Sequence, residues 1–235
     1  MADGLYVSMC GAVARAEQLE AVADNLANAQ TPGFKAARPA FESFMAPSGA
    51  QDKHYAAAVA TGFDLRPGPT ANTGNPLDVV PDDGAFLTVR TAAGAIAHTR
   101  DGRLTLDAER RLVSDGRLVL GRDGQPISLP PETTARIGRN GEVQAGEHVV
   151  GELALVRLEG PVDRVGASLL APGQGGRAVP VDSGVRTGEL ELGNATALDA
   201  AVQLVSAQRA YDASMQALQT YRSMDQRAVE VARVK

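Results

Sequence analysis

The sequence of 235 residues lacks tryptophan and contains one cysteine, Cys10. A single cysteine excludes an intramolecular disulfide and leaves no cysteine set for a zinc site. No stretch approaches the roughly 18 apolar residues that a membrane-spanning helix needs. The N-terminus also lacks the basic and apolar regions of a cleaved secretory signal peptide. The sequence therefore predicts a protein without a disulfide framework and without direct membrane insertion.

Lysine is scarce, and arginine supplies 20 of the 23 basic residues. Lys35, Lys53 and Lys235 are the only lysines, and the formal net charge is −5. A chain of this charge has no general attraction for nucleic acid, so we expect no nucleic-acid partner. Hydrophobic residues make up 44% of the chain, which is enough for a packed core.

Residues with catalytic or metal-binding chemistry are scattered along the chain. His54, His98 and His148 have no metal-ligand spacing, and we expect each of them on the surface or on an edge strand. The sequence contains no nucleophile elbow, phosphate-binding loop or EF-hand spacing. It therefore predicts no catalytic residue, no cofactor-binding residue and no metal site, and hence a protein that is not an enzyme.

The region from Ala2 to Gln30 predicts one long helix, because it has no proline and a helical repeat of apolar residues. The repeat advances by alternate steps of four and three, as in a coiled-coil seam. Thr31-Pro32-Gly33 ends the helix, since Pro32 lacks an N–H and Gly33 tolerates a positive φ. The predicted seam consists of Leu5, Met9, Ala12, Ala16, Leu19, Ala23 and Leu26.

The region from Pro39 to Glu191 carries every proline except Pro32 and predicts a β domain. Asp-Gly and Asn-Gly pairs punctuate it, and these pairs are strong signals for hairpin turns. Their regular spacing predicts an antiparallel β domain over residues 76–193, after an irregular connector over residues 36–75. The turn pairs are Asp83-Gly84, Asp101-Gly102, Asp115-Gly116, Asp123-Gly124 and Asn140-Gly141, and the strands between them include 85–89, 103–106, 117–120 and 152–158.

The region from Asn194 to the end predicts a second and longer helix. Thr196 and Asp199 fit a capping box at its start. Apolar positions again step by three and four, and a second apolar row lies on a neighbouring face, so we expect more than one helical neighbour. The seam is Ala201, Leu204, Gln208, Tyr211, Met215, Leu218, Arg222, Asp225 and Val229, and the second row is Ala217, Tyr221, Met224, Ala228 and Val231.

Together these regions predict an α+β fold, with N- and C-terminal helices that form a coiled-coil-like helical domain and a central antiparallel β domain. Residues 1–35 and 194–235 form the predicted helical domain. Its two helices are expected to pair with each other, either parallel or antiparallel. One such pairing leaves apolar surface uncovered, especially on the longer helix, and exposed apolar surface marks an interaction site.

Three stretches, in the same order, resemble the flagellar rod and hook axial proteins, and together they cover most of the chain. The stretches are Asn25-Leu26-Ala27-Asn28 with Thr31, Gly33, Phe34 and Lys35; the middle pattern with Thr73-Gly74, Leu77-Asp78 and Thr99-Arg100; and Leu190-Glu191, Asn194 and Gln208-Arg209-Ala210-Tyr211. Among these proteins, the chain most resembles the proximal, F-type rod proteins, and then the distal, G-type ones.

The resemblance implies a structural subunit of the bacterial flagellar basal-body rod, the drive shaft that spans the periplasm and transmits torque from motor to hook. In that family the terminal helices pack against those of neighbouring subunits and form the inner tube of a helical filament. The implied partners are copies of the protein itself, other flagellar rod proteins and the flagellar type III export apparatus. That apparatus exports such chains from the cytoplasm without a cleaved signal peptide.

The resemblance also implies which residues lie at the interface between subunits. Phe34 is expected to anchor the chain after the helix stop, either within its own subunit or, in the interpretation we prefer here, on a neighbouring subunit. The candidate interface residues are Leu5, Leu19, Asn25, Leu26, Asn28, Thr31, Gly33, Phe34, Asn194, Leu204, Gln208, Arg209, Tyr211, Met215 and Leu218.

Two other classes of protein stay open at this point. An exported β-rich module that binds peptidoglycan, oligomerised by its helices, predicts a discrete closed oligomer, whereas a rod subunit predicts an open filament. An enzyme that acts on peptidoglycan needs a carboxylate in a cleft.

Overall fold

The computed structural model describes residues 2–45 and 54–233, which form two compact units. The helical unit contains the chain up to Ala27, residues 37–62 and the chain from Thr196 onward. The β unit contains residues 28–36 and 63–195. The chain is thus α+β, but the end of the first sequence motif belongs to the β unit and not, as predicted, to the helical domain.

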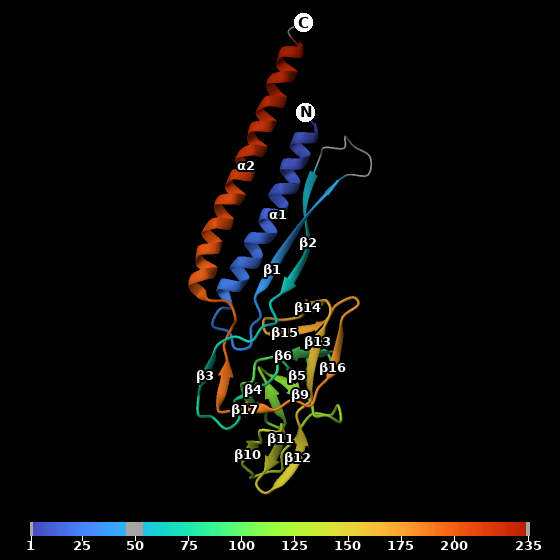
Figure 1. Ribbon diagram of the computed structural model, residues 1–235, viewed down its shortest axis with the longest axis vertical. Coiled ribbons are helices and arrows are strands. Elements are labelled where there is room, and N and C mark those ends of the chain that lie inside the picture. Colours follow the sequence, from blue (N-terminus) through green and yellow to red (C-terminus); the bar gives the residue numbers. More distant parts are fainter. Residues whose placement is uncertain (1, 46–53, 234–235) are drawn as a thin grey trace. The chain divides into compact units, whose positions relative to one another are not determined.

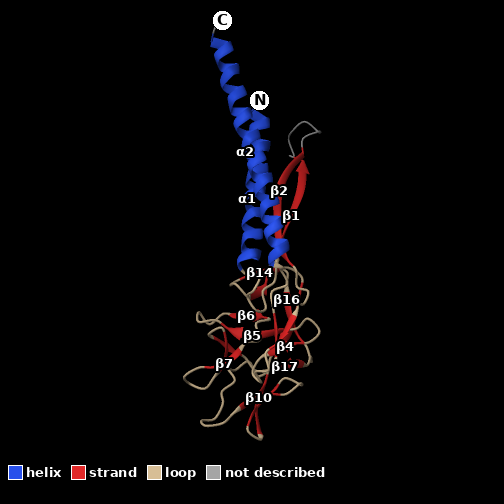
Figure 2. Ribbon diagram, turned by 90° about the vertical axis from the view of Figure 1, so that its left-hand side faces the viewer, coloured by secondary structure: helices blue, strands red, loops and turns tan. Residues whose placement is uncertain are grey.

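Two long helices dominate the helical unit, α1 (Ala2–Ala27) and α2 (Ala197–Arg233). Figures 1 and 2 show them side by side, with the start of α1 and the end of α2 at the same end of the pair, so the helices run antiparallel. The predicted cap of α2 is confirmed, since the Asp199 backbone N–H donates to Thr196 Oγ1 at 3.3 Å.

The irregular connector predicted over residues 36–75 is wrong where regular strands occur. β1 (Ala37–Met45) pairs with β2 (His54–Phe63), and β3 (Thr70–Asn72) follows; residues 46–53 of the predicted connector lie outside the described residues. β1 also packs against α1 within the helical unit. The two strands mix alanines with Phe, Tyr and Val, which favour strands, but show no clear periodicity that would predict them.

The buried face of α1 is offset from the predicted seam. Ala14 and Val22 are buried, whereas the seam residues Met9 and Ala23 are exposed. The offset arises because α1 packs against both α2 and β1, so its buried face lies between these neighbours. Of the other described seam positions, Ala12 is buried, and Ala16, Leu19 and Leu26 are half-buried.

The buried face of α2 follows a heptad-like repeat that overlaps the predicted seam. Ala200, Ala207 and Leu218 are its most buried residues, and Leu204 and Tyr211 lie between them, half-buried. Steps of four and three connect Ala200 to Tyr211, and a step of seven leads on to Leu218, in keeping with the predicted period. Alanines at the contact allow close approach of the two helices.

The β unit is built from short strands, and every pairing with a described register is antiparallel. Its largest sheet has the order β14-β15-β6-β5-β9-β8-β7, with β13 pairing to β5 and β16. A separate sheet has the order β10-β11-β12, and the pairs β17-β4 and β18-β3 complete the unit. The strands are β4 (Val79–Pro81), β5 (Phe86–Arg90), β6 (Ile96–Thr99), β7 (Leu104–Leu106), β8 (Leu112–Ser114), β9 (Arg117–Val119), β10 (Ala135–Ile137), β11 (Glu142–Ala145), β12 (His148–Glu152), β13 (Leu155–Glu159), β14 (Val162–Arg164), β15 (Leu169–Pro172), β16 (Arg177–Pro180), β17 (Val185–Thr187) and β18 (Glu189–Glu191).

The predicted hairpin turns are confirmed in part. Asp115-Gly116, with both φ values positive, joins the paired strands β8 and β9, and Asn140-Gly141 joins β10 and β11. Asp83-Gly84 and Asp101-Gly102 instead connect strands that do not pair with each other. Asp101 lies in the interior, so a dipeptide typical of surface hairpins serves here as a buried bend.

The main core of the β unit gathers residues from most of its strands, with Leu87, Leu104, Leu112, Val119 and Leu153 at most 1% exposed. His98 also lies inside, on β6 between β5 and β15, with Nδ1 at 3.4 Å from Thr88 Oγ1. The expected surface position is therefore wrong for His98, while His148 is exposed as expected. His54 lies among residues whose side chains are not described.

Within residues 2–45 and 54–233, no helix combines the length and apolarity needed to cross a membrane.

Candidate functional site: the Glu191 cluster and the helix faces

The segment that follows α1 is fixed by its backbone. The Thr31 N–H donates to the Asn28 carbonyl at 2.9 Å, and the Gly33 N–H donates to the Glu191 carbonyl at 2.8 Å. Gly33 has φ +68°, and a Cβ at this position would lie 2.2 Å from the Asp101 nitrogen. Glycine is therefore required at this position both for its backbone conformation and for the close approach of a second segment.

Phe34 is fully buried inside the β unit. The guanidinium carbon of Arg164 lies 4.4 Å from the Phe34 ring centroid and 4.8 Å from that of Phe63. Arg164 also donates to the Lys35 carbonyl, so β14 holds the segment through both stacking and hydrogen bonding. The preferred interpretation of Phe34 as an anchor on a neighbouring subunit is thus wrong, because its ring has no surface left to offer.

Three charged side chains meet beside this segment, and we call Lys35, Arg100 and Glu191 the Glu191 cluster. Lys35 Nζ lies 2.6 Å from Glu191 Oε1, and Arg100 Nε donates to Glu191 Oε2 at 2.5 Å. All three side chains are at most 2% exposed. One carboxylate therefore binds two buried cations.

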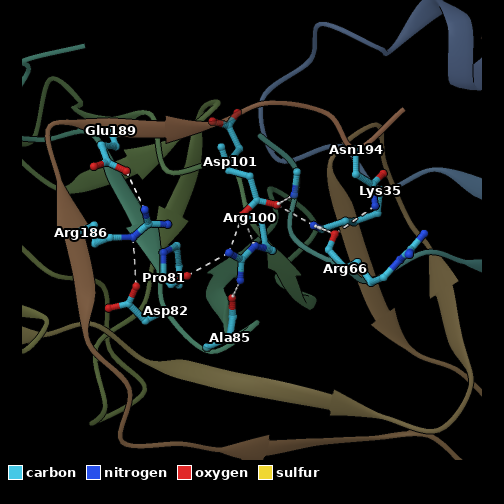
Figure 3. Close-up of polar contacts among 12 residues, drawn as sticks. Lys35, Arg66, Pro81, Asp82, Ala85, Arg100, Asp101, Arg186, Glu189 and Asn194 are labelled. Carbon is cyan, nitrogen blue, oxygen red and sulfur yellow. Dashed lines mark hydrogen bonds and ion pairs between the residues drawn. The ribbon is translucent and has the colours of Figure 1, made fainter. Parts of the chain in front are cut away.

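Backbone groups satisfy the remaining hydrogen bonds of the cluster. The Gly68 N–H donates to Glu191 Oε1 at 3.0 Å, and Lys35 Nζ donates to the Arg66 carbonyl at 2.7 Å. Figure 3 shows Arg100 reaching the carbonyls of Pro81 and Ala85 with the other end of its guanidinium group. Pairing and hydrogen bonding of this kind are what make buried charges tolerable in a protein interior.

Burial and pairing act in opposite directions on the pKa of Glu191. Burial alone raises it, but hydrogen bonds and charge from Arg100 and then Lys35 outweigh burial and hold the pKa below its usual value. Burial lowers the pKa of Lys35, and Glu191 only partly offsets that effect. The cluster is therefore held in its charged form by the carboxylate that its two cations share.

Asn194 binds the same segment a second time. Its Oδ1 accepts from the Ala36 N–H at 2.7 Å, and its Nδ2 donates to the carbonyls of Asp64 and Arg66 at 2.6 and 3.1 Å. Asn194 thus links the ends of three segments of the β unit that are far apart in the sequence. Asn25 has a similar role in the helical unit, where its amide exchanges two hydrogen bonds with the Ala37 backbone at 2.9 and 2.8 Å.

The candidate interface residues on α2 differ in exposure. Gln208 and Arg209 are exposed, Leu204, Tyr211 and Met215 are half-buried, and Leu218 is 6% exposed. On α1, Leu19 and Leu26 are half-buried, and the side chain of Leu5 lies outside the described residues. Asn28 and Thr31, which follow the helix, are also half-buried.

Two apolar faces of the helices are uncovered in the single chain. On α2, Leu198, Val202 and Val205 are 76%, 64% and 51% exposed. Their spacing of four and three places them on one face, beside a hollow of about 470 Å³ along Ala201, Val202, Val205, Ser206 and Arg209. Met9 and Val13 form a smaller exposed pair on α1. We call these two surfaces the α2 face and the α1 face.

The β unit offers little that suggests catalysis. A hollow of about 390 Å³ contains the carboxylates of Glu152 and Asp182, and both pair with Arg122. Across the described part of the chain, no group of three or more His, Cys, Asp or Glu residues is placed to hold a metal ion.

The Glu191 cluster was not predicted from the sequence, although all three of its residues lie in the stretches that resemble the flagellar axial proteins. Two signals were present: Lys35 is one of three lysines, and Glu191 ends a short strand directly before the second helix region. Neither signal shows which residues meet, because the contacts join positions up to 156 apart.

Comparison with protein families gives three matches in chain order. A model described as flagella basal body rod protein matches residues 5–35, one described as flagellar hook protein FlgE/F/G D1 domain matches residues 82–145, and one described as flagellar basal body rod FlgEFG protein C-terminal matches residues 186–231. Each matched stretch contributes one member of the Glu191 cluster.

Curated relatives match nearly the whole chain. The flagellar basal-body rod protein FlgF of Mesorhizobium japonicum is 30% identical over 218 residues, which cover 90% of each chain. FlgF of Salmonella typhimurium is 29% identical over 93% of each chain, and FlgG of Borreliella burgdorferi is 28% identical over 95% of this chain and 96% of its own. The chain therefore belongs to the family of flagellar basal-body rod proteins, which are structural components of the flagellum and not enzymes.

Proposed function

We propose that this protein is a subunit of the flagellar rod that polymerises through its terminal helices and transmits torque from motor to hook. The observation that carries the proposal is the α2 face. Three large apolar side chains at helical spacing are more than half exposed there, and water-exposed apolar stripes of this kind are covered when a partner binds. The α1 face supplies a second, smaller contact.

The half-exposed seam of α1 supports the same proposal. Met9 and Ala23 are exposed although they belong to the predicted coiled-coil seam, so the single chain leaves part of that seam uncovered. Helices of neighbouring copies packing on α1 and α2 would bury these positions. Contacts repeated from subunit to subunit without closing into a ring produce a filament.

We further propose the proximal, F-type position in the rod, with copies of this protein and other rod proteins as neighbours. Delivery there, across the inner membrane into the periplasm, would use the flagellar type III export apparatus without a cleaved signal peptide. The absence of a disulfide-forming pair suits a chain that passes unfolded through a narrow channel.

A charge on the α2 face tests the proposal. Val202→Asp places a carboxylate on the exposed stripe, and Gln203→Asp places the same charge on the neighbouring exposed position of the same helix. We expect Val202→Asp to abolish incorporation into basal bodies while the purified chain keeps its helical circular dichroism, and Gln203→Asp to assemble. Normal basal bodies with Val202→Asp would contradict the proposal. A discrete closed ring of the purified protein would favour the peptidoglycan-binding module instead.

A further inference from the structure

The Glu191 cluster joins residues that the chain supplies at very different points. Lys35 and Arg100 lie in the first half of the sequence, and both cations are buried in the β unit. The carboxylate that binds both of them comes from β18, near the end of the unit. Until β18 is in place, closing the β unit would bury two cations close together without that carboxylate.

Residues 185–194, which contain Glu191, also contact the rest of the β unit through strand pairing, through hydrogen bonds to its backbone and through the main core. β17 pairs with β4, with Val185 opposite Pro81, and β18 pairs with β3, with Glu191 opposite Thr70. The Glu191 carbonyl accepts from the Gly33 N–H, and Asn194 binds the backbone of residues 36, 64 and 66. Val185 is 1% exposed and belongs to the main core.

We propose that residues 185–194, which we call the latch, dock last during folding onto residues 33–36, 68–72 and 79–81. Without the latch, the rest of the β unit does not close into its compact folded state. Glu191 is the central residue of the latch because it neutralises Lys35 and Arg100 at once. Removing one partner of a buried charged group leaves the others desolvated and unpaired, which strongly disfavours the closed state. The unit is thus stable only when both ends of its sequence are present.

The latch gives a reason for the order of events during export, and this consequence rests on the proposed function. A chain that leaves the cell N-terminus first delivers residues 185–194 after the rest of the β unit. The unit would then close only once it has emerged completely. The latch itself depends only on contacts within the β unit, and it is tested separately from export.

Folding kinetics of the full chain test whether the latch closes last. Glu191→Gln removes the charge, and Glu189→Gln is the matched control, because Glu189 lies on the same strand but pairs with Arg186 at the surface. Figure 3 shows Glu189 with Arg186 and Asp82, apart from Arg100.

Pulse-labelled hydrogen exchange of peptides from β5 and β9 reports on the folding of the β unit. We expect Glu191→Gln to raise the unfolding rate by more than about a hundredfold and to leave the folding rate within about twofold. A folding rate that falls in proportion to the lost stability, or no change in either rate, would overturn the proposal.

A second variant covers the case in which Glu191→Gln does not fold. Val185→Ala shortens a core side chain of the same segment without touching the charges. Val185→Ala is expected to speed unfolding and to leave the folding rate unchanged, because contacts that form after the folding transition state affect only the unfolding rate. Slower folding of Val185→Ala would mean that the segment docks early, and the latch would be rejected.

Loss of the Glu191 charge should change how stability depends on pH, which loss of an uncharged packing contact would not do. Lys35 faces Glu191, Arg100 and, at longer range, Asp64, whose own carboxylate pairs with Arg66. Without Glu191, folded Lys35 sheds its proton more readily than unfolded Lys35, so the unfolded state binds more protons and stability rises with pH. Between about pH 7 and about pH 9.5, the urea midpoint of Glu191→Gln should rise more than that of the wild type. Lys35→Met/Glu191→Gln should lose this extra rise. Parallel pH profiles of wild type and Glu191→Gln would show that Glu191 does not act by neutralising Lys35.

Discussion

Lys35 Nζ contacts Glu191 Oε1 at 2.6 Å, although 156 positions separate the two residues in the sequence. Arg100, from the middle of the chain, binds the other oxygen of the same carboxylate. One buried carboxylate thus connects all three stretches by which the chain matches rod proteins. The β unit is therefore not an insertion that is independent of the terminal motifs, because it includes parts of both.

Phe34→Ala tests whether Phe34 stabilises the subunit from within. The ring is fully buried and stacks on Arg164, so its removal should lower the free energy of unfolding of the β unit by about 3–5 kcal/mol. Hydrogen exchange in denaturant measures the loss. Leu198→Ala, at a position 76% exposed, should leave stability nearly unchanged. An equally stable Phe34→Ala chain that fails to assemble would restore the interface interpretation.

Comparing Gly33→Ala with Gly84→Ala separates the cost of a steric clash from the cost of a positive φ. Gly33 and Gly84 both have φ +68°, but a Cβ on Gly84 meets no atom within 4 Å, whereas one on Gly33 meets the backbone of Arg100 and Asp101. Gly84→Ala should cost about 1–2 kcal/mol from the left-handed conformation alone. Gly33→Ala should cost clearly more, measured as the difference between their urea midpoints. Equal losses for the two variants would mean that the contact with residues 100 and 101 adjusts freely.

His98 should make the β unit sensitive to mild acid. Burial lowers the pKa of His98 from its usual 6.5 to about 4. Since the folded pKa lies below the unfolded one, the unfolded state binds more protons, and stability falls as the pH drops from 6.5 toward about 4. His98→Gln should flatten this part of the stability profile. Identical slopes for wild type and His98→Gln would rule out His98 as the source.

Tyrosine fluorescence should follow the helical unit separately from the β unit. The four tyrosines, Tyr6, Tyr55, Tyr211 and Tyr221, all fall within the sequence ranges of the helical unit. The helical unit leaves large apolar side chains such as Leu198 and Val202 exposed, whereas the β unit has a fully buried core, so the fluorescence transition should come at lower urea than hydrogen exchange in β5. Coincident transitions would mean that the two units unfold as one.

Local sequence signals predicted the features that depend on neighbouring residues. The two helices, the start of α2 at Thr196 and the turns at Asp115-Gly116 and Asn140-Gly141 all rest on periodicity, capping or turn chemistry within a few positions. Gly33 with its positive φ belongs to the same group.

Features that depend on distant contacts escaped prediction. β1 and β2 escaped prediction because their sequences show no clear periodicity; the two strands pair with each other, and β1 packs on α1. Phe34 looked like an exposed anchor because nothing nearby in the sequence indicates that Arg164 covers it. The Glu191 cluster needs three segments to meet, and periodicity within any one of them carries no information about the other two.

Electron microscopy of basal bodies from a strain that carries only a chain lacking residues 200–235 tests the central claim most directly. That deletion removes most of α2, including Val202 and Val205, and leaves the β unit and the Glu191 cluster complete. The account predicts a stable β unit by hydrogen exchange and basal bodies whose rod does not incorporate the shortened chain. Complete rods containing the shortened chain would contradict assembly through the terminal helices.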